Sequence, residues 1–110
     1  MIDDTLRKME QRLDAAKAMK SEDREALRDL LAELKVEVEQ LSGDEAEQAD
    51  SIAGFAEASA REAVREQQDP ALFDTAITGL KQSVERFEVS HPSLTGVVNR
   101  ICHALADLGI

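Results

Sequence analysis

Glu88 and His91 have the Glu-x-x-His spacing that supplies ligands in carboxylate-bridged di-iron helical bundles. Such a centre needs two of these motifs and two further glutamates on other helices. The second histidine, His103, has Arg100 three residues before it, so the ligand set is incomplete. Pro92 also bends the backbone next to His91. We therefore expect Glu88 to end a solvated helix face and His91 to cap the helix that starts at Pro92.

Cys102 and His103 are the other residues whose types could carry chemistry. Together with Glu88 and His91 they define one alternative function, a metal-binding or enzymatic helical protein. Adjacent residues on a helix point about 100° apart, and nothing in the spacing predicts a Cys–His pair within hydrogen-bonding reach. Cys102 follows an apolar Ile101 and fits a small core or boundary residue. We therefore predict no catalytic, cofactor-binding or metal-ligating residue, and no cofactor.

The acidic stretch from Glu37 to Asp50 could suggest calcium. An EF-hand loop needs alternating ligands, a central glycine and a final bidentate glutamate. Gly43 precedes the densest part of the acidic stretch and does not divide it. The stretch therefore fits a solvated helix face. Neither a glycine-rich phosphate loop nor a G-x-S-x-G motif is present.

Composition and charge set aside further classes of function. The net charge of −10 argues against nucleic acid, which requires a basic face, and against an anionic membrane surface. No apolar run approaches the length of about 20 residues that crosses a membrane, and the first residues lack the pattern of a signal peptide. We expect a cytoplasmic protein without disulfides, because its cysteine is single. The acid excess leaves a second alternative, a regulator that binds a basic protein.

The elements that must position these residues are helices. The chain has three Phe and no Trp or Tyr, so its core must come from Leu, Val, Ile and Ala, which suits helices better than strands. Apolar residues recur at 4-3-4-3 spacing in five segments, each forming one stripe on a helix. The segments span about residues 3–19, 21–41, 44–67, 70–89 and 92–108. The fold class is therefore all-α, either an antiparallel bundle or a set of extended helical hairpins.

The boundaries between these segments carry recognisable signals. Ser21 is expected to cap the second helix, and Gly43 to end it in a left-handed conformation. Asp69 followed by Pro70 predicts an N-cap and a first helical residue. Gly109 is expected to end the last helix. The joint before Ser21 is so short that the first two helices should form an antiparallel hairpin.

The length of 110 residues predicts one domain. Within it we distinguish a helical hairpin at residues 1–42, an alanine-rich helix at residues 44–68, and a C-terminal helix pair at residues 69–110 with a Ser-His-Pro corner. The small side chains of the alanine-rich helix let another helix approach closely but bury little area each.

The last 25 residues contain the pattern R-F-E-V-S-H-P-S-L, which is followed by A-L-A-D-L-G-I at residues 104–110. This segment resembles a small family of uncharacterised bacterial proteins, a domain of unknown function, whose members end in R-F-E-x-x-H-P-[ST]-L and A-L-x-x-L-G-I. The resemblance implies a short helical protein without an assigned activity. It also implies that a structural corner is shared by the family, and residues 45–75 look longer than in its usual members, which suggests an insertion. The corner residues are Phe87, His91, Pro92 and Leu94.

The number of stripes suggests a function. Four helices with single-sided stripes close a square bundle, so a fifth stripe would be left for a second copy or another protein. We therefore expect a non-enzymatic interaction or adaptor module that associates with itself, and we favour a homodimer. Two stripes are the candidate seams: Leu27, Leu31, Leu34, Val38 and Leu41 on one helix, and Ala49, Ala53, Ala56 and Ala60 on the next.

Overall fold

The computed structural model describes residues 2–16, 19–65 and 67–108, and within them it confirms an all-α fold of five α-helices. The helices are α1 (Ile2–Ala15), α2 (Ser21–Glu39), α3 (Ala46–Ala63), α4 (Pro70–Glu85) and α5 (Pro92–Ala106), with one 3₁₀ turn, η1 (Gly43–Glu45), before α3. Within this part of the chain, no helix is both long and apolar enough to span a membrane.

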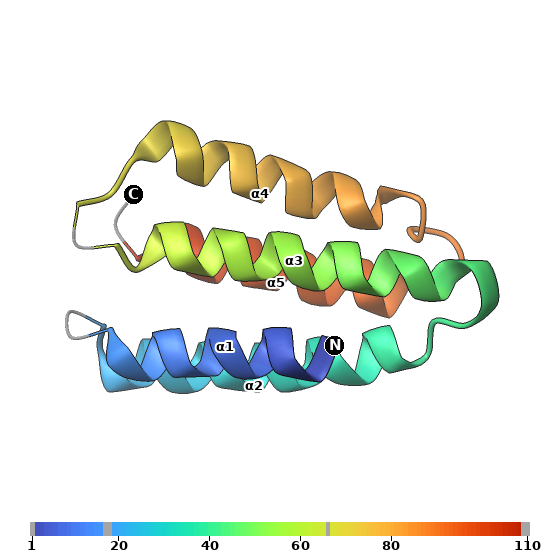
Figure 1. Ribbon diagram of the computed structural model, residues 1–110, viewed down its shortest axis with the longest axis horizontal. Helices are drawn as coiled ribbons and strands as arrows, with labels where there is room; N and C mark the ends of the chain where they lie inside the picture. The colour runs from blue at the N-terminus through green and yellow to red at the C-terminus, as the bar shows by residue number, and fades with distance from the viewer. Residues whose placement is uncertain (1, 17–18, 66, 109–110) are drawn as a thin grey trace.

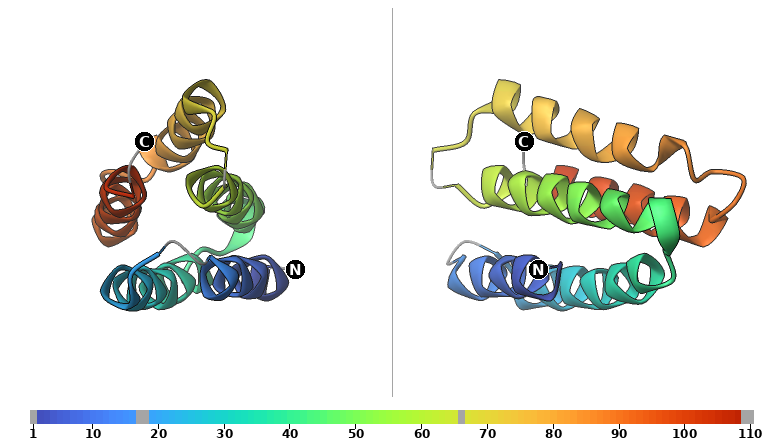
Figure 2. Two further views of the ribbon diagram at one scale, coloured as in Figure 1. Left: turned by 90° about the vertical axis from the view of Figure 1, so that its left-hand side faces the viewer. Right: turned by 45° about the vertical axis from the view of Figure 1, so that its right-hand side comes forward.

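The five helices lie side by side in a closed ring, α1–α2–α5–α4–α3 and back to α1. Seen end on, α1 and α2 form the base, α3 and α5 the two sides, and α4 the top (Figure 2). The first two helices form the expected antiparallel hairpin (Figure 1). The chain then crosses one end of the bundle from α2 to α3, and α5 returns to lie between α2 and α4. Because α3 also contacts α2 and α5 across the middle, the interior is filled.

Every helix turns its apolar stripe toward this interior. One continuous cluster of buried side chains joins all five helices. Leucine, valine and isoleucine supply most of its volume, and Phe73 and Phe87 are its two aromatic members. The closed ring thus satisfies the 4-3-4-3 pattern of all five segments within one chain, because each stripe faces two neighbouring helices.

The start of α4 confirms the expected cap. The Asp69 carboxylate accepts hydrogen bonds from the backbone N–H groups of Ala71 (3.0 Å) and Leu72 (3.3 Å), and Pro70 is the first helical residue. The prediction for α2 was wrong by one residue: Lys20 occupies the N-cap position without a side-chain cap, and Ser21 is already helical. The acidic side chains of its first turn stabilise this start through the helix dipole.

Several helices end earlier than the apolar pattern predicts. α2 ends at Glu39 with Gln40 as its C-cap, so Gly43 does not end the helix; its φ of +60° instead turns the chain into η1. α4 ends at Glu85, and residues 86–90 form a turn that still buries Phe87. The apolar spacing of the sequence continues through this turn, because Phe87 can pack into the core without being part of a helix. The cap predicted at Gly109 lies outside the described residues.

Candidate interaction surfaces

The two predicted seams lie inside the bundle. All nine side chains are buried, with exposed fractions of at most 8%. In this fold no stripe is left over for a partner, because a ring of five helices accommodates what a square of four would not. A second copy could reach these residues only if the ring opened. The nine residues are Leu27, Leu31, Leu34, Val38 and Leu41 on and just after α2, and Ala49, Ala53, Ala56 and Ala60 on α3.

The corner between α4 and α5 is a packed structural feature. Phe87 is buried beneath it, and the His91 ring meets the Phe87 ring edge to face, with centroids 5.7 Å apart. Leu94 is buried in the same cluster. His91 occupies the N-cap position of α5 as expected, but its side chain makes no cap hydrogen bond. Its Nε2 lies 3.3 Å from the Glu45 carboxylate instead, which ties the corner to η1.

The residues of the metal-binding alternative do not converge. His91 is the N-cap of α5, and Cys102 lies on that helix eleven residues later. This separation corresponds to about 16 Å along the helix axis at 1.5 Å per residue. Cys102 is buried, whereas His103 and Glu88 are exposed. Across the described part of the chain, no three His, Cys, Asp or Glu side chains group as metal ligands would.

Cys102 is buried in the core cluster of the bundle. Burial raises the pKa of its thiol, because a thiolate would lose solvation there, and the positive charge of Lys81 opposes this effect. A raised pKa keeps the sulfur protonated and a poor nucleophile at neutral pH. The expected role of Cys102 as a small apolar residue agrees with this environment.

Polar contacts tie three pairs of neighbouring helices together. From α2, the Arg24 guanidinium donates to the carbonyls of Leu13 (2.9 Å) and Ala16 (2.8 Å) at the end of α1. Arg12 Nε donates to Glu57 Oε1 at 2.9 Å and links α1 to α3. The third link is an ion pair of 3.4 Å between Arg100 of α5 and Glu33 of α2. Half-exposed pairs of this kind contribute about 0–1 kcal/mol each, so they select neighbours more than they stabilise the fold.

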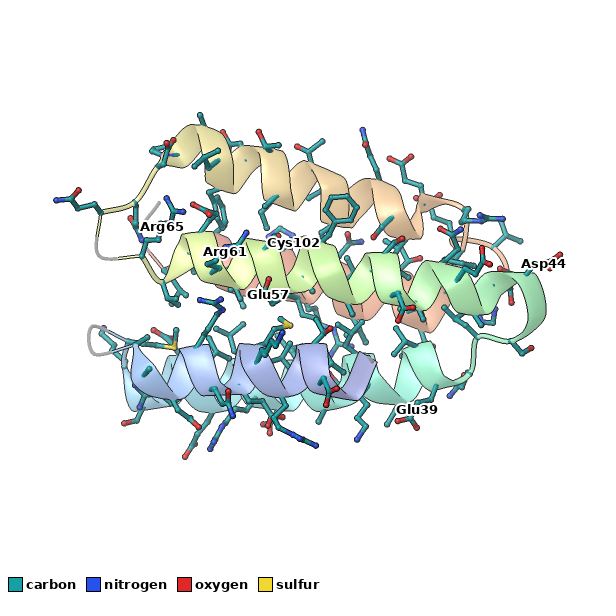
Figure 3. The ribbon with its side chains drawn as sticks, in the orientation of Figure 1. Glu39, Asp44, Glu57, Arg61, Arg65 and Cys102 are labelled. Atoms are coloured by element: carbon teal, nitrogen blue, oxygen red, sulfur yellow. The ribbon has the colours of Figure 1, made fainter. Side chains whose placement is uncertain are left out.

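A charged cluster extends from Glu57 along α3. Arg61 lies 3.6 Å from Glu57 and 3.7 Å from Glu62, and Arg65 Nε lies 3.2 Å from Glu62 Oε1. Figure 3 shows Glu57 and Arg61 on α3 and Arg65 just beyond the end of this helix. Glu62 is buried, yet its Oε1 accepts no well-aligned hydrogen bond. Its charge is balanced by the two arginines, so the cluster needs no external ion.

The acidic stretch lies where α2 passes to α3. Glu39 and Asp44 are exposed at that end of the bundle (Figure 3). No described His, Cys, Asp or Glu joins them in a metal-binding group. Glu39 and Asp44 therefore have the environment of a solvated surface.

The outer face of α3 and α4 differs from the charged surfaces. Phe55 is 41% exposed and lies against Gly79 of α4, where an added Cβ would overlap its ring. Leu72, seven residues before Gly79 and so on the same side of α4, is 46% exposed. Among the described residues, no side-chain ion pair links α3 to α4. These two helices are held together by apolar contacts, and part of that apolar surface faces outward.

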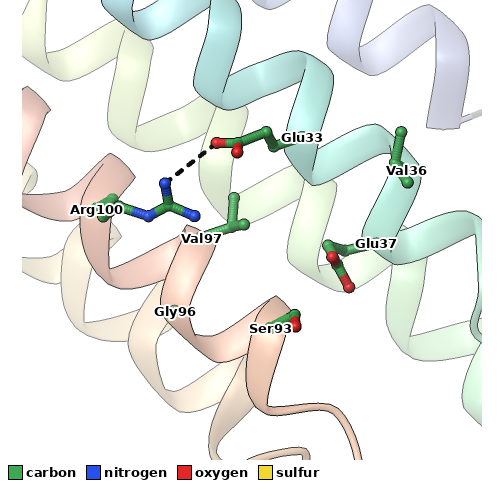
Figure 4. A pocket seen from close by; sticks show the side chains of 7 residues that line it. All are labelled: Glu33, Val36, Glu37, Ser93, Gly96, Val97 and Arg100. Atoms are coloured by element: carbon green, nitrogen blue, oxygen red, sulfur yellow. Dashed lines mark ion pairs between the residues drawn. The ribbon is translucent and has the colours of Figure 1, made fainter.

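A second surface feature is a groove of about 390 Å³ between α2 and α5 (Figure 4). Its residues come from one face of each helix, at helical spacings of three and four. Glu33 and Arg100 form the ion pair across it. The lining residues are Glu33, Val36 and Glu37 of α2, and Ser93, Gly96, Val97 and Arg100 of α5.

The sequence interpretation did not identify these two surfaces. A signal exists in each case: Val36 falls on the polar side of α2, between the stripe residues Leu34 and Val38, and Phe55 lies beside the alanine stripe. By position alone, either could belong to a wider apolar stripe. Only the exposure of Val36 and Phe55 in the folded chain distinguishes a surface residue from a core residue at such a boundary position.

Comparison with known proteins identifies a family model that matches this chain. No curated protein and no solved structure shows significant similarity to the chain. The family model described as "Domain of unknown function (DUF4404)" matches residues 2–110, and the match includes α3 as well as the corner. The chain therefore belongs to the DUF4404 family of domains of unknown function.

Proposed function

We propose that this protein is a non-enzymatic helical interaction module that forms a homodimer through the outer face of α3 and α4. The observation that carries the proposal is the exposure of Phe55 and Leu72 on that face, although the interior of the bundle is complete. An exposed phenylalanine and leucine on neighbouring helices provide apolar area that a second copy could bury.

Charge favours this face over the others for self-association. Two copies that each carry a net charge of −10 repel one another unless their contact surfaces are nearly neutral. α4 contains only Asp74, Lys81 and Glu85 as charged residues, and the neighbours of Phe55 on the outer side of α3 include Ser51 and Ala58. A two-fold axis near this face would pair the same apolar patch with itself, as closed dimers require.

Light-scattering mass after size exclusion tests this proposal. We expect a dimer for the natural chain and a monomer for Leu72→Asp, with unchanged helicity by circular dichroism. Val89→Asp is the matched control, because Val89 is 94% exposed in the turn after α4 and should stay dimeric. A monomeric natural chain, or a Leu72→Asp variant that remains dimeric, would overturn the proposed interface.

A further inference from the structure

The groove between α2 and α5 has the dimensions of a helix-binding site. Its α5 wall runs from Ser93 to Arg100, about 10 Å or two turns at 1.5 Å per residue. α2 and α5 pack directly against each other, so the groove lies on the outside of that pair. Two adjacent helices with side chains at spacings of three and four present a channel into which the ridge of a third helix can fit.

The middle of the groove is apolar and open. Val36 is 56% exposed on one wall, and Val97 lies buried opposite. Gly96 has no side chain, and a Cβ built on it would meet no atom within 4 Å. Because its φ is not in the left-handed region, no backbone requirement explains a glycine in this helix. An aliphatic side chain from outside would find contacts with Val36 and Val97 in the space above Gly96.

The charged residues that line the groove are Glu33, Glu37 and Arg100. α2 carries seven carboxylates and three cations, whereas α5 has Arg100 as its one permanently charged residue. Arg100 is engaged by Glu33. Glu37, one turn further along α2, has no described cation within ion-pairing distance and lies half-buried on the wall. A lysine or arginine entering beside the apolar centre would complement this carboxylate.

We propose that the groove between α2 and α5 docks a basic amphipathic helix of a partner protein, with an aliphatic side chain over Gly96 and a lysine or arginine against Glu37. This inference deepens the proposed role as an interaction module by naming a partner and its surface. The groove lies on the α2–α5 side of the ring, and the dimer face lies on α3 and α4, so one chain could use both at once.

A fluorescent amphipathic peptide of leucine and lysine, about 18 residues or five helical turns long, is the probe. Its binding is measured by fluorescence anisotropy, with a matched peptide in which every lysine is glutamate as the negative control. Gly96→Leu places a side chain in the centre of the groove, where its Cβ meets no atom within 4 Å, and should weaken binding by about tenfold or more, as expected for a residue at the centre of an interface. Gly54→Leu is the matched variant, because Gly54 is also a helical glycine with open space around it, and it should bind as the natural chain does.

The charge part of the proposal has its own pair of variants. Glu37→Gln should weaken binding severalfold and reduce its salt dependence, because one charge pair is lost. Glu25→Gln removes an exposed carboxylate from α2 outside the groove and should change binding much less. Backbone amide shifts on peptide addition should concentrate around Val36, Gly96 and Val97.

Three results would overturn the proposal. The peptide could fail to bind, it could bind Gly96→Leu as tightly as Gly54→Leu, or the shifts could spread over all acidic faces. The last two results would indicate general attraction to a chain of charge −10. Peptide binding to a monomeric chain would refute the dimer alone, and a dimer without peptide binding would refute the groove alone.

Discussion

α2 and α3 bury stripes of the same spacing but of different size. The stripe of α2 consists of leucines and a valine and faces α1 and α5, whereas that of α3 is mainly alanine and faces α1 and α4. Large side chains supply buried apolar area at roughly 25 cal/mol per Å². Small ones contribute little area but allow neighbouring helix axes to come closer within the usual 8–10 Å range. The two stripes therefore have the same spacing but different roles: that of α2 fills the interior, and that of α3 allows neighbouring helices to approach closely.

The two roles predict opposite sensitivities to side-chain size. α2 should tolerate little truncation, because each of its leucines fills volume that its neighbours cannot reclaim. α3 should tolerate little enlargement, because its alanines face other helices at close range. Substitutions of the same chemical kind on buried and exposed positions test this contrast.

Leu34→Ala should have the largest effect. Leu34 is fully buried at the middle of the α2 stripe, so the change removes apolar area and leaves a cavity. We expect a loss of about 2–5 kcal/mol in the free energy of unfolding, measured by urea denaturation. Val36→Ala is the control on the same helix, since Val36 is 56% exposed, and should cost less than about 1 kcal/mol. Equal losses in the two variants would show that α2 does not fill the interior.

Ala56→Leu should have the next largest effect. Ala56 is fully buried on α3, and three added carbons have no space unless α1 or α4 moves outward. We expect a loss of about 1–3 kcal/mol in the same assay. Ala32→Leu makes the same change on the exposed side of α2 and should stay within about 0.5 kcal/mol of the natural chain. A neutral or stabilising Ala56→Leu would contradict the close approach of α3 to its neighbours.

Gly79→Ala should have the smallest effect and sharpens the contrast at the contact between α3 and α4. Alanine favours a helix over glycine by up to about 1 kcal/mol, but the new methyl group would displace the Phe55 ring. In a Phe55→Ala background that opposition disappears, so Gly79→Ala should be more favourable there by about 0.5 kcal/mol or more. A double-mutant cycle measures the difference. Identical effects in both backgrounds would mean that Phe55 does not rest on Gly79.

The candidate surfaces were less accessible to prediction than the fold. Phe87 and Leu94, which the sequence placed at the corner, are buried, and the environment of Cys102 agrees with its expected role. The groove was not predicted, because Glu37 and Gly96 belong to helices that are neighbours in space but far apart in sequence. The sequence around Glu37 and the sequence around Gly96 do not indicate that the two residues line the same groove.

The sequence by itself determined the five helices, the side of each that is buried, and the Asp69 cap before α4. These are local properties: periodicity selects the buried face, and a side chain two or three residues away satisfies a helix-start N–H. Only the tertiary structure decided the ring order, with α5 between α2 and α4, and the use of all five stripes within one chain. Stripes of identical spacing fit one another in many orders, so the choice depends on side-chain volumes and on contacts such as Arg12–Glu57 and Phe55–Gly79 that exist only once the helices have met.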